Sequence, residues 1–363
     1  MLLAGFLATR ITKLLKLPNV TAYILVGVAI GPFCLDLIPK SVVGGMSFLS
    51  DVALAFIAFG VGEFFRLKTM KENGGKIAVI TLFEALVASV FVFILTFFIL
   101  KLDLAFSVVL AALASATAST MMTIRQTKAH GDFVDTLLGA VALDDVVSLV
   151  AFSVAISLAM ASTGGKVGAA DIVLPILYNV LLIATGCALG FLLKLLMNNR
   201  STDNRLIIAI AFLFAVCGAG AALGVSPLLG CMAMGTVYIN ATEDDRLFKQ
   251  LNYFSPPILL LFFVYSGLNF RIDALFDMKS SLNGIPLIVI GVTYFIVRIA
   301  GKYAGAFTGC LITKKPKETR NYLGLALIPQ AGVAIGLVVM AARTIGGEQG
   351  SVLQTVVLSS SIL

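Results

Sequence analysis

Charged residues are scarce in this sequence. They make up 12% of its 363 residues, whereas hydrophobic residues make up 59% and the mean hydropathy is +1.03. A soluble domain is about 25% charged and about 45–50% apolar, so the composition excludes an ordinary soluble fold. Apolar runs of about 20 residues recur along the chain, and each is long enough to cross a hydrocarbon core of about 30 Å as a helix. Lipid is therefore the expected solvent.

Residue types that metal and catalytic sites need are also few. The chain has one histidine, which cannot build a histidine metal site, and no glycine-rich phosphate loop followed by Lys-Ser/Thr. Its cysteines lack the C-x-x-C spacing of metal or redox sites, so we interpret them as small apolar residues. They are Cys34, Cys187, Cys217, Cys231 and Cys310. We therefore expect neither an enzyme nor a bound cofactor.

Apolar segments bounded by charges, glycine and proline predict about thirteen membrane-crossing helices. They lie near residues 1–13, 20–38, 46–65, 77–100, 104–126, 134–161, 172–197, 205–223, 225–240, 250–268, 284–311, 321–342 and 350–363. The first and last of these are expected to be incomplete. The predicted fold is all-α and polytopic.

The net charge of +7 could indicate a nucleic-acid partner, but Lys and Arg lie in short loops between apolar segments. Alternate loops hold eighteen of them: Arg10, Lys13, Lys16, Arg66, Lys68, Lys71, Lys76, Arg125, Lys128, Lys194, Arg200, Arg205, Arg246, Lys249, Lys314, Lys315, Lys317 and Arg320. The opposite loops hold six: Lys40, Lys101, Lys166, Arg271, Lys279 and Arg343. Cytoplasmic loops are enriched in Lys and Arg. We therefore expect no nucleic acid, an N-terminus outside and a C-terminus in the cytoplasm of a prokaryotic inner (cell) membrane.

Five ionisable residues fall inside the apolar segments, where no side chain can reach an interface: Glu84, Asp144, Asp145, Arg298 and Lys302. A charge at the bilayer centre costs about 2.5 kcal/mol or more, so such residues normally pair or line a pathway. Asp144 and Asp145 are adjacent and point about 100° apart on a helix, which gives them different neighbours. A buried ion-pair cluster with no transport role is the alternative, but two acids (Asp144 and Asp145) and two bases (Arg298 and Lys302) are an expensive structural contact.

The two basic residues, Arg298 and Lys302, are spaced i and i+4 and share one helix face. We hypothesise that Arg298 is locked to Glu84, which lies at a similar depth from the cytoplasmic side. Arginine stays charged at any physiological pH, whereas a buried lysine can titrate. Lys302 would then alternate between Asp144 and solvent.

Two apolar segments carry polar interruptions at the same depth. Residues 114–120 place four hydroxyls in the segment 104–126, and residues 329–336 place a proline and two glycines in the segment 321–342. Each alone is a weak signal, because hydroxyls often bond back to their helix and proline often only kinks it. One segment is expected to enter from outside and the other from the cytoplasm, which is typical of inverted repeats with two crossed, broken helices. The expected broken-helix elements are Thr117, Pro329, Gln330 and Gly332.

Four motifs resemble those of the monovalent cation–proton antiporters of the NapA and KefB type. They are Leu17-Pro-Asn-Val-Thr-Ala-Tyr23 with Gly27 and Gly31-Pro32, Ala142-Leu-Asp-Asp145, Arg298-Ile-Ala-Gly-Lys302 with Gly305, and Gly324 to Gly336. They occur in the family's order over most of the chain. The resemblance is specific to the family though not to the ion.

The resemblance implies an NhaA/NapA-like antiporter fold, a homodimer and electrogenic exchange by an elevator movement. A dimerisation and scaffold domain would comprise residues 1–45 and 165–245, and an ion-translocating core would comprise residues 46–164 and 246–363. Asp145 would bind the transported cation and Asp144 would pair with Lys302. We expect the hydroxyls of Thr117, Ser119 and Ser148 to join them in ion and proton binding. Arg298 beside Lys302, and Glu84 as a further acid, depart from the family pattern.

A buried carboxylate holds either a proton or a small hard cation, but not both at full strength. Competition at one site is sufficient for exchange of Na⁺ for H⁺, with K⁺ or Li⁺ as alternative cations. A K⁺/H⁺ antiporter of the same fold, a sodium-coupled symporter and a cation channel are the other readings. A symporter would need no buried lysine paired to an acid, and a non-transporting receptor would need no intramembrane charges.

Overall fold

The computed structural model describes residues 1–14, 19–117, 131–163, 169–197, 201–223, 225–273, 281–330 and 332–362. Helices dominate these residues, as expected. Five of them are long and apolar enough to cross a membrane: α5 (Leu67–Phe93), α8 (Asp132–Thr163), α9 (Ala169–Leu196), α10 (Thr202–Leu223) and α15 (Leu287–Ile312). The strands β1 (Ser281–Leu282) and β2 (Ile285–Pro286) form a short antiparallel pair.

Every apolar segment predicted from the sequence overlaps a helix. The shorter ones are α1 (Leu2–Leu14), α2 (Asn19–Ile30), α4 (Phe48–Gly62), α6 (Leu104–Ser115), α11 (Leu228–Thr242) and α18 (Gly347–Ile362). The segment 250–268 is a pair bent by 50°, α12 (Arg246–Phe254) and α13 (Pro256–Leu268). The segment 321–342 is also divided, into α16 (Lys317–Ala326) and α17 (Val333–Ile345). Among the described residues, the helix α3 (Lys40–Gly45) was not predicted, and neither were the π-helix η1 (Ile94–Ile99) that continues α5 and the strand pair β1–β2.

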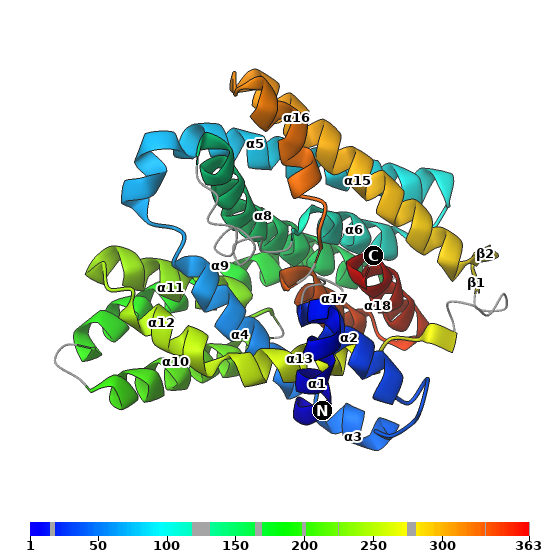
Figure 1. Ribbon diagram of the computed structural model, residues 1–363, viewed down its shortest axis with the longest axis horizontal. Coiled ribbons are helices and arrows are strands. Elements are labelled where there is room, and N and C mark those ends of the chain that lie inside the picture. The colour runs from blue at the N-terminus through cyan, green and yellow to red at the C-terminus, as the bar shows by residue number, and fades with distance from the viewer. Residues whose placement is uncertain are drawn as a thin grey trace.

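The helices form two groups (Figure 1). One group contains α5, α6, α8, α15, α16 and α18, which pack on one another. The other contains α1, α2, α4 and α10 to α13, in which α4 packs on α11 and α13 packs on α2. The helices α9 and α17 contact both groups, because α9 packs on α11 and α8, and α17 packs on α18 and α4. The polar centre described below lies within the first group.

A stripe of small residues sets the contact between α5 and α15. A Cβ atom at Gly301, Gly305 or Gly309 would lie 2.7, 2.6 and 2.8 Å from the Cα atoms of Ala88, Glu84 and Ile80. Real side chains do not tolerate such distances, so only glycine lets the two backbones approach this closely. The glycines on α15 and the residues that they contact on α5 are each spaced four residues apart, and residue numbers rise along α15 while they fall along α5. The helices are therefore antiparallel, with Glu84 opposite the turn that carries Lys302.

Glycine contacts also join helices of the second group to one another and to α9. A Cβ at Gly186 of α9 would meet the carbonyl oxygen of Gly230 at 2.0 Å, and one at Gly27 of α2 would meet that of Val264 at 2.1 Å. Gly235 of α11 lies against the carbonyl of Phe59 in the same way, at 2.3 Å. Close backbone approach without large side chains is typical of helix packing in lipid, where no hydrophobic force drives helices together.

Candidate functional site

Both predicted helix interruptions occur. The helix α6 ends at Ser115, and Ala116 is extended with φ −60° and ψ 132°. The helix α16 ends at Ala326 and α17 starts at Val333, with Pro329 in the gap and Gly332 at φ +58°. This φ strains any residue with a side chain, which explains the glycine. Ser119 lies outside the described residues.

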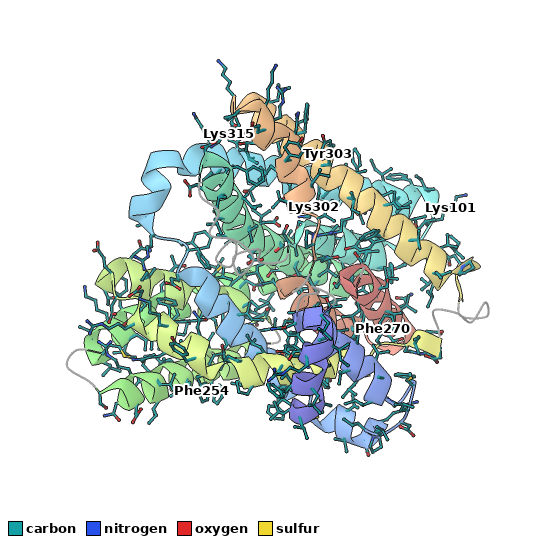
Figure 2. All side chains as sticks on the ribbon, in the orientation of Figure 1. Lys101, Phe254, Phe270, Lys302, Tyr303 and Lys315 are labelled. Carbon is teal, nitrogen blue, oxygen red and sulfur yellow. The ribbon has the colours of Figure 1, made fainter. Side chains whose placement is uncertain are left out.

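Lys302 is the centre of the polar cluster and is fully buried on α15 (Figure 2). Its ammonium donates to the carboxylate of Glu84 and, at 3.3 Å, to Asp144 Oδ2. It also contacts the carbonyl of Ser115 at 2.5 Å and Thr117 Oγ1 at 2.6 Å. One lysine therefore holds two carboxylates from α5 and α8 together with the end of α6.

Asp144 and Asp145 have different surroundings, as their angle on the helix predicts. Asp144 is fully buried, and Thr117 Oγ1 donates to its Oδ2. Asp145 is 7% exposed. The Oδ1 atoms of both have no hydrogen-bond partner in the part of the chain that the structure describes. Buried carboxylate oxygens without a protein donor are suited to bind a proton or a cation.

Ser148 is buried one helical turn from Asp145. Its hydroxyl donates to the backbone carbonyl of Asp145 at 3.0 Å rather than to a carboxylate. Its oxygen keeps free lone pairs, so it remains a possible ligand of a cation beside Asp145. Thr117, in contrast, lies directly between Lys302 and Asp144.

Arg298 does not pair with Glu84, which corrects the sequence-based hypothesis. Its guanidinium is fully buried and donates to three backbone carbonyls: Nε to Ala114 at 3.1 Å, Nη1 to Ile328 at 2.6 Å and Nη2 to Ala116 at 2.8 Å. The last carbonyls of a helix have no partner within it and carry partial negative charge. The two broken helix ends therefore satisfy Arg298, and Glu84 is left to Lys302.

Gln330 joins the same two breaks from the other side. Its Nε2 donates to the carbonyl of Leu113 at 2.8 Å and lies 3.2 Å from the hydroxyl of Tyr294. Ser360 Oγ of α18 donates to its Oε1 at 3.2 Å. Sequence reasoning missed Tyr294 and Ser360. Tyr294 precedes Arg298 by four residues, so the shared helix face of Tyr294, Arg298 and Lys302 was a signal that could have found it.

Buried charges and broken helices at the centre of an apolar helix bundle define a membrane transporter. The whole chain, residues 1–363, matches the transmembrane family of sodium/hydrogen exchangers, and the protein belongs to that family. The family is one of cation/proton antiporters and not of enzymes, which confirms the resemblance seen in the motifs.

Individual relatives agree with this assignment. The chain is 25% identical to the ammonium/H⁺ antiporter subunit AmhT of Alkalihalophilus pseudofirmus, over 95% of this chain and 85% of that protein. It is 22% identical to the K⁺/H⁺ antiporter subunit KhtU of Bacillus subtilis, over 82% and 76% of the two chains. The structure of the sodium proton antiporter MjNhaP1 of Methanocaldococcus jannaschii superposes with a TM-score of 0.80 at 18% identity, covering 99% and 91% of the chains. The fold is therefore that of MjNhaP1.

Proposed function

We propose that the protein exchanges Na⁺ for protons across a membrane. The observation that carries this proposal is the Asp144–Asp145 pair, in which each carboxylate keeps one buried oxygen with no partner among the described residues. Such an oxygen binds a proton or a hard cation, and the two exclude each other at one site. If only the loaded site crosses between the two sides, cations and protons must move in opposite directions.

In this mechanism Asp145 is the shared carrier of cation and proton. Asp144 already binds Lys302 and Thr117, so it is less free than Asp145 to exchange these partners for a cation. Two carboxylates beside one lysine allow more protons than cations to move in each cycle, and we therefore propose electrogenic exchange. The membrane potential would bias such exchange by about 2.3 kcal/mol per charge per 100 mV.

We further propose about thirteen membrane crossings arranged as inverted repeats. The break after α6 and the break between α16 and α17 would cross at the site. Transport would occur by an elevator movement of a core domain against a scaffold domain. The proposed scaffold is residues 1–45 and 165–245, and the core is residues 46–164 and 246–363. Helix packing supports adding α4 and α13 to the scaffold, since α4 packs on α11 and α13 packs on α2.

The proposed assembly is a homodimer in a prokaryotic cell membrane, with the N-terminus outside and the C-terminus in the cytoplasm. The motif resemblance supports the dimer, and the bias of basic residues supports the orientation. A particle that is monomeric in both detergent and lipid nanodiscs would contradict the dimer. Labelling of single cysteines placed near Lys40 and Lys317, with a reagent that cannot cross membranes, tests the orientation.

K⁺ is the second candidate cation. It is favoured by the likeness to KhtU and AmhT, whose names give K⁺ and ammonium as their substrates and which this chain matches over most of its length. The candidate ligands among the described residues of the site are oxygen atoms, and these do not by themselves choose between the ions, because selectivity depends on the number and geometry of ligands.

Proteoliposomes with an internal pH dye test the function directly. The purified protein should move protons when Na⁺, K⁺, Li⁺ or ammonium is added outside, and the concentration giving half-maximal rate ranks the cations. We expect Na⁺ to give the tightest response. Repeating the assay at imposed potentials of either sign tests electrogenicity, since an electroneutral exchanger would show equal rates. Absence of cation-driven proton movement for all four ions would contradict antiport.

A further inference from the structure

We propose that Arg298 and Gln330 are positioning residues that fasten the end of α6 to the break between α16 and α17, so that the two broken helices move as one body. The pair is called the carbonyl clamp below. Its importance for exchange rests on the proposed antiport function, but its geometry does not.

The first observation concerns the end of α6. Four successive backbone carbonyls there each accept a hydrogen bond from a side chain of another element. The pairs are Leu113 with Gln330, Ala114 with Arg298, Ser115 with Lys302 and Ala116 with Arg298. A helix leaves its last four carbonyls without internal partners, and in lipid no water replaces them. The clamp and Lys302 satisfy the carbonyls of residues 113–116, and the hydroxyl of Ser115 donates to the carbonyl of Ala112 at 2.8 Å.

The second observation is that the same guanidinium reaches both breaks. Arg298 Nη1 donates to Ile328, one residue before Pro329, while Nε and Nη2 donate to the end of α6. The planar guanidinium presents its donors in a fixed fork, which an ammonium cannot reproduce. One rigid side chain therefore fixes the distance between two chain segments that are more than 200 residues apart in sequence.

The clamp has two consequences for ion binding. Because each of these α6 carbonyls already accepts a hydrogen bond, we expect a cation beside Asp145 to take its ligands mainly from carboxylate and hydroxyl oxygens. The clamp also fixes Thr117, which directly follows Ala116 and donates to Asp144. Arg298 thus places a permanent positive charge and a positioned hydroxyl near the carboxylates without touching them.

Charge and geometry are separable by mutation. The ionisable groups that face Arg298 are Tyr294 and Lys302 on its own helix, Glu84 on α5 and Asp144 on α8. Arg298→Gln removes a fixed positive charge near Glu84 and Asp144, and a nearby positive charge favours the ionised form of a carboxylate. The pH of half-maximal exchange should shift by about one unit to the alkaline side. Arg298→Lys keeps the charge but loses the fork, and Gln330→Ala changes no charge. Both should lower the maximal rate about tenfold with little change in the pH profile.

A readout independent of transport accompanies these assays. Amide hydrogen exchange should rise at residues 113–117 and 327–330 together in Arg298→Gln, because both breaks lose their donor, and Lys249→Gln is the control. The clamp is overturned if Arg298→Gln keeps the wild-type pH profile and rate, or if only one of the two segments changes. If Arg298→Gln does not fold, the clamp is tested with Arg298→Lys and Gln330→Ala, by measuring their exchange rate over pH and their amide hydrogen exchange. If the wild-type protein shows no exchange with any cation, the proposed function fails, and the hydrogen-exchange result still decides the clamp.

Discussion

Lys302 and Glu84 form an ion pair across the closest contact between α15 and α5, and the same ammonium also reaches Asp144. Both side chains are 0–1% exposed. The glycine stripe on α15 brings the α5 backbone to this position, so packing and electrostatics depend on the same turn of helix. Lys302 therefore has two acidic partners, Glu84 and Asp144.

Removing Lys302 should destabilise the protein more than removing Glu84. Lys302→Met strands two buried carboxylates and should cost about 3–5 kcal/mol. Glu84→Gln leaves Lys302 bound to Asp144, Ser115 and Thr117, and should cost about 1–3 kcal/mol. Thermal unfolding in detergent measures both. The double variant should recover part of the loss.

The matched control is Lys249→Met, which removes a lysine from an exposed pair with Asp245. Exposed surface pairs contribute little to stability, so this variant should unfold near the wild-type temperature. Equal losses in all three single variants would contradict the pairing.

Gly305 should tolerate no side chain. A Cβ there would lie 2.6 Å from Glu84 Cα and 2.6 Å from the carbonyl oxygen of Phe83. Both are backbone atoms, so Gly305→Ala must push α15 away from α5 and should cost about 1–3 kcal/mol. Exchange should fall as well, because the Lys302–Glu84 pair is separated. Gly60→Ala is the control, since a Cβ at Gly60 of α4 meets nothing within 4 Å. Similar unfolding temperatures for the two variants would contradict this account of the helix contact.

The elevator movement should strain one contact between the helix groups. Arg343 of α17 lies 3.2 Å from both carboxylate oxygens of Asp51 at the start of α4. If α17 slides relative to α4, joining these positions must block transport. In a cysteine-free background, Asp51→Cys with Arg343→Cys should lose at least about tenfold of the exchange rate when linked by a short, reducible bifunctional thiol reagent, and reduction should restore it.

A linkage within the core provides the comparison. Lys315, in the loop between α15 and α16, lies 2.8 Å from Asp132 at the start of α8, and all three helices belong to the first group. Linking cysteines at these two positions should leave exchange unchanged. Full exchange after quantitative linkage of positions 51 and 343 would contradict a sliding core.

Much of the architecture was predictable because lipid imposes simple rules. Apolar length located the helices, and proline, glycine and hydroxyls located both breaks, since a helix that loses its own hydrogen bonds must meet polar groups in the bundle. The five buried charges were found because no other charges lie so deep. These features are local in sequence, so they need no knowledge of how helices pack.

The partners of the two bases were not predictable in the same way. Arg298 and Lys302 are separated by one helical turn, about 6 Å, whereas depths read from sequence are uncertain by about two to four residues. Which of these two bases reaches Glu84 depends on the register between α5 and α15, and the contact of Gly305 with Glu84 fixes that register. The backbone carbonyls that bind Arg298 could not be predicted either, because the sequence does not show which backbone groups accept a side-chain hydrogen bond. The packing of α4 on α11 and of α13 on α2 was also not predictable, because it depends on tertiary contacts.

The central claim is that Asp145 carries both cation and proton, and Asp145→Asn tests it most directly. The variant removes the charge but keeps the shape, so it should fold, elute and unfold like the wild type. In proteoliposomes its cation-driven proton movement should fall to the level of empty vesicles, while Asp203→Asn, the same change at an exposed position at the start of α10, should keep wild-type exchange. Exchange by Asp145→Asn at a rate near that of Asp203→Asn would contradict the mechanism.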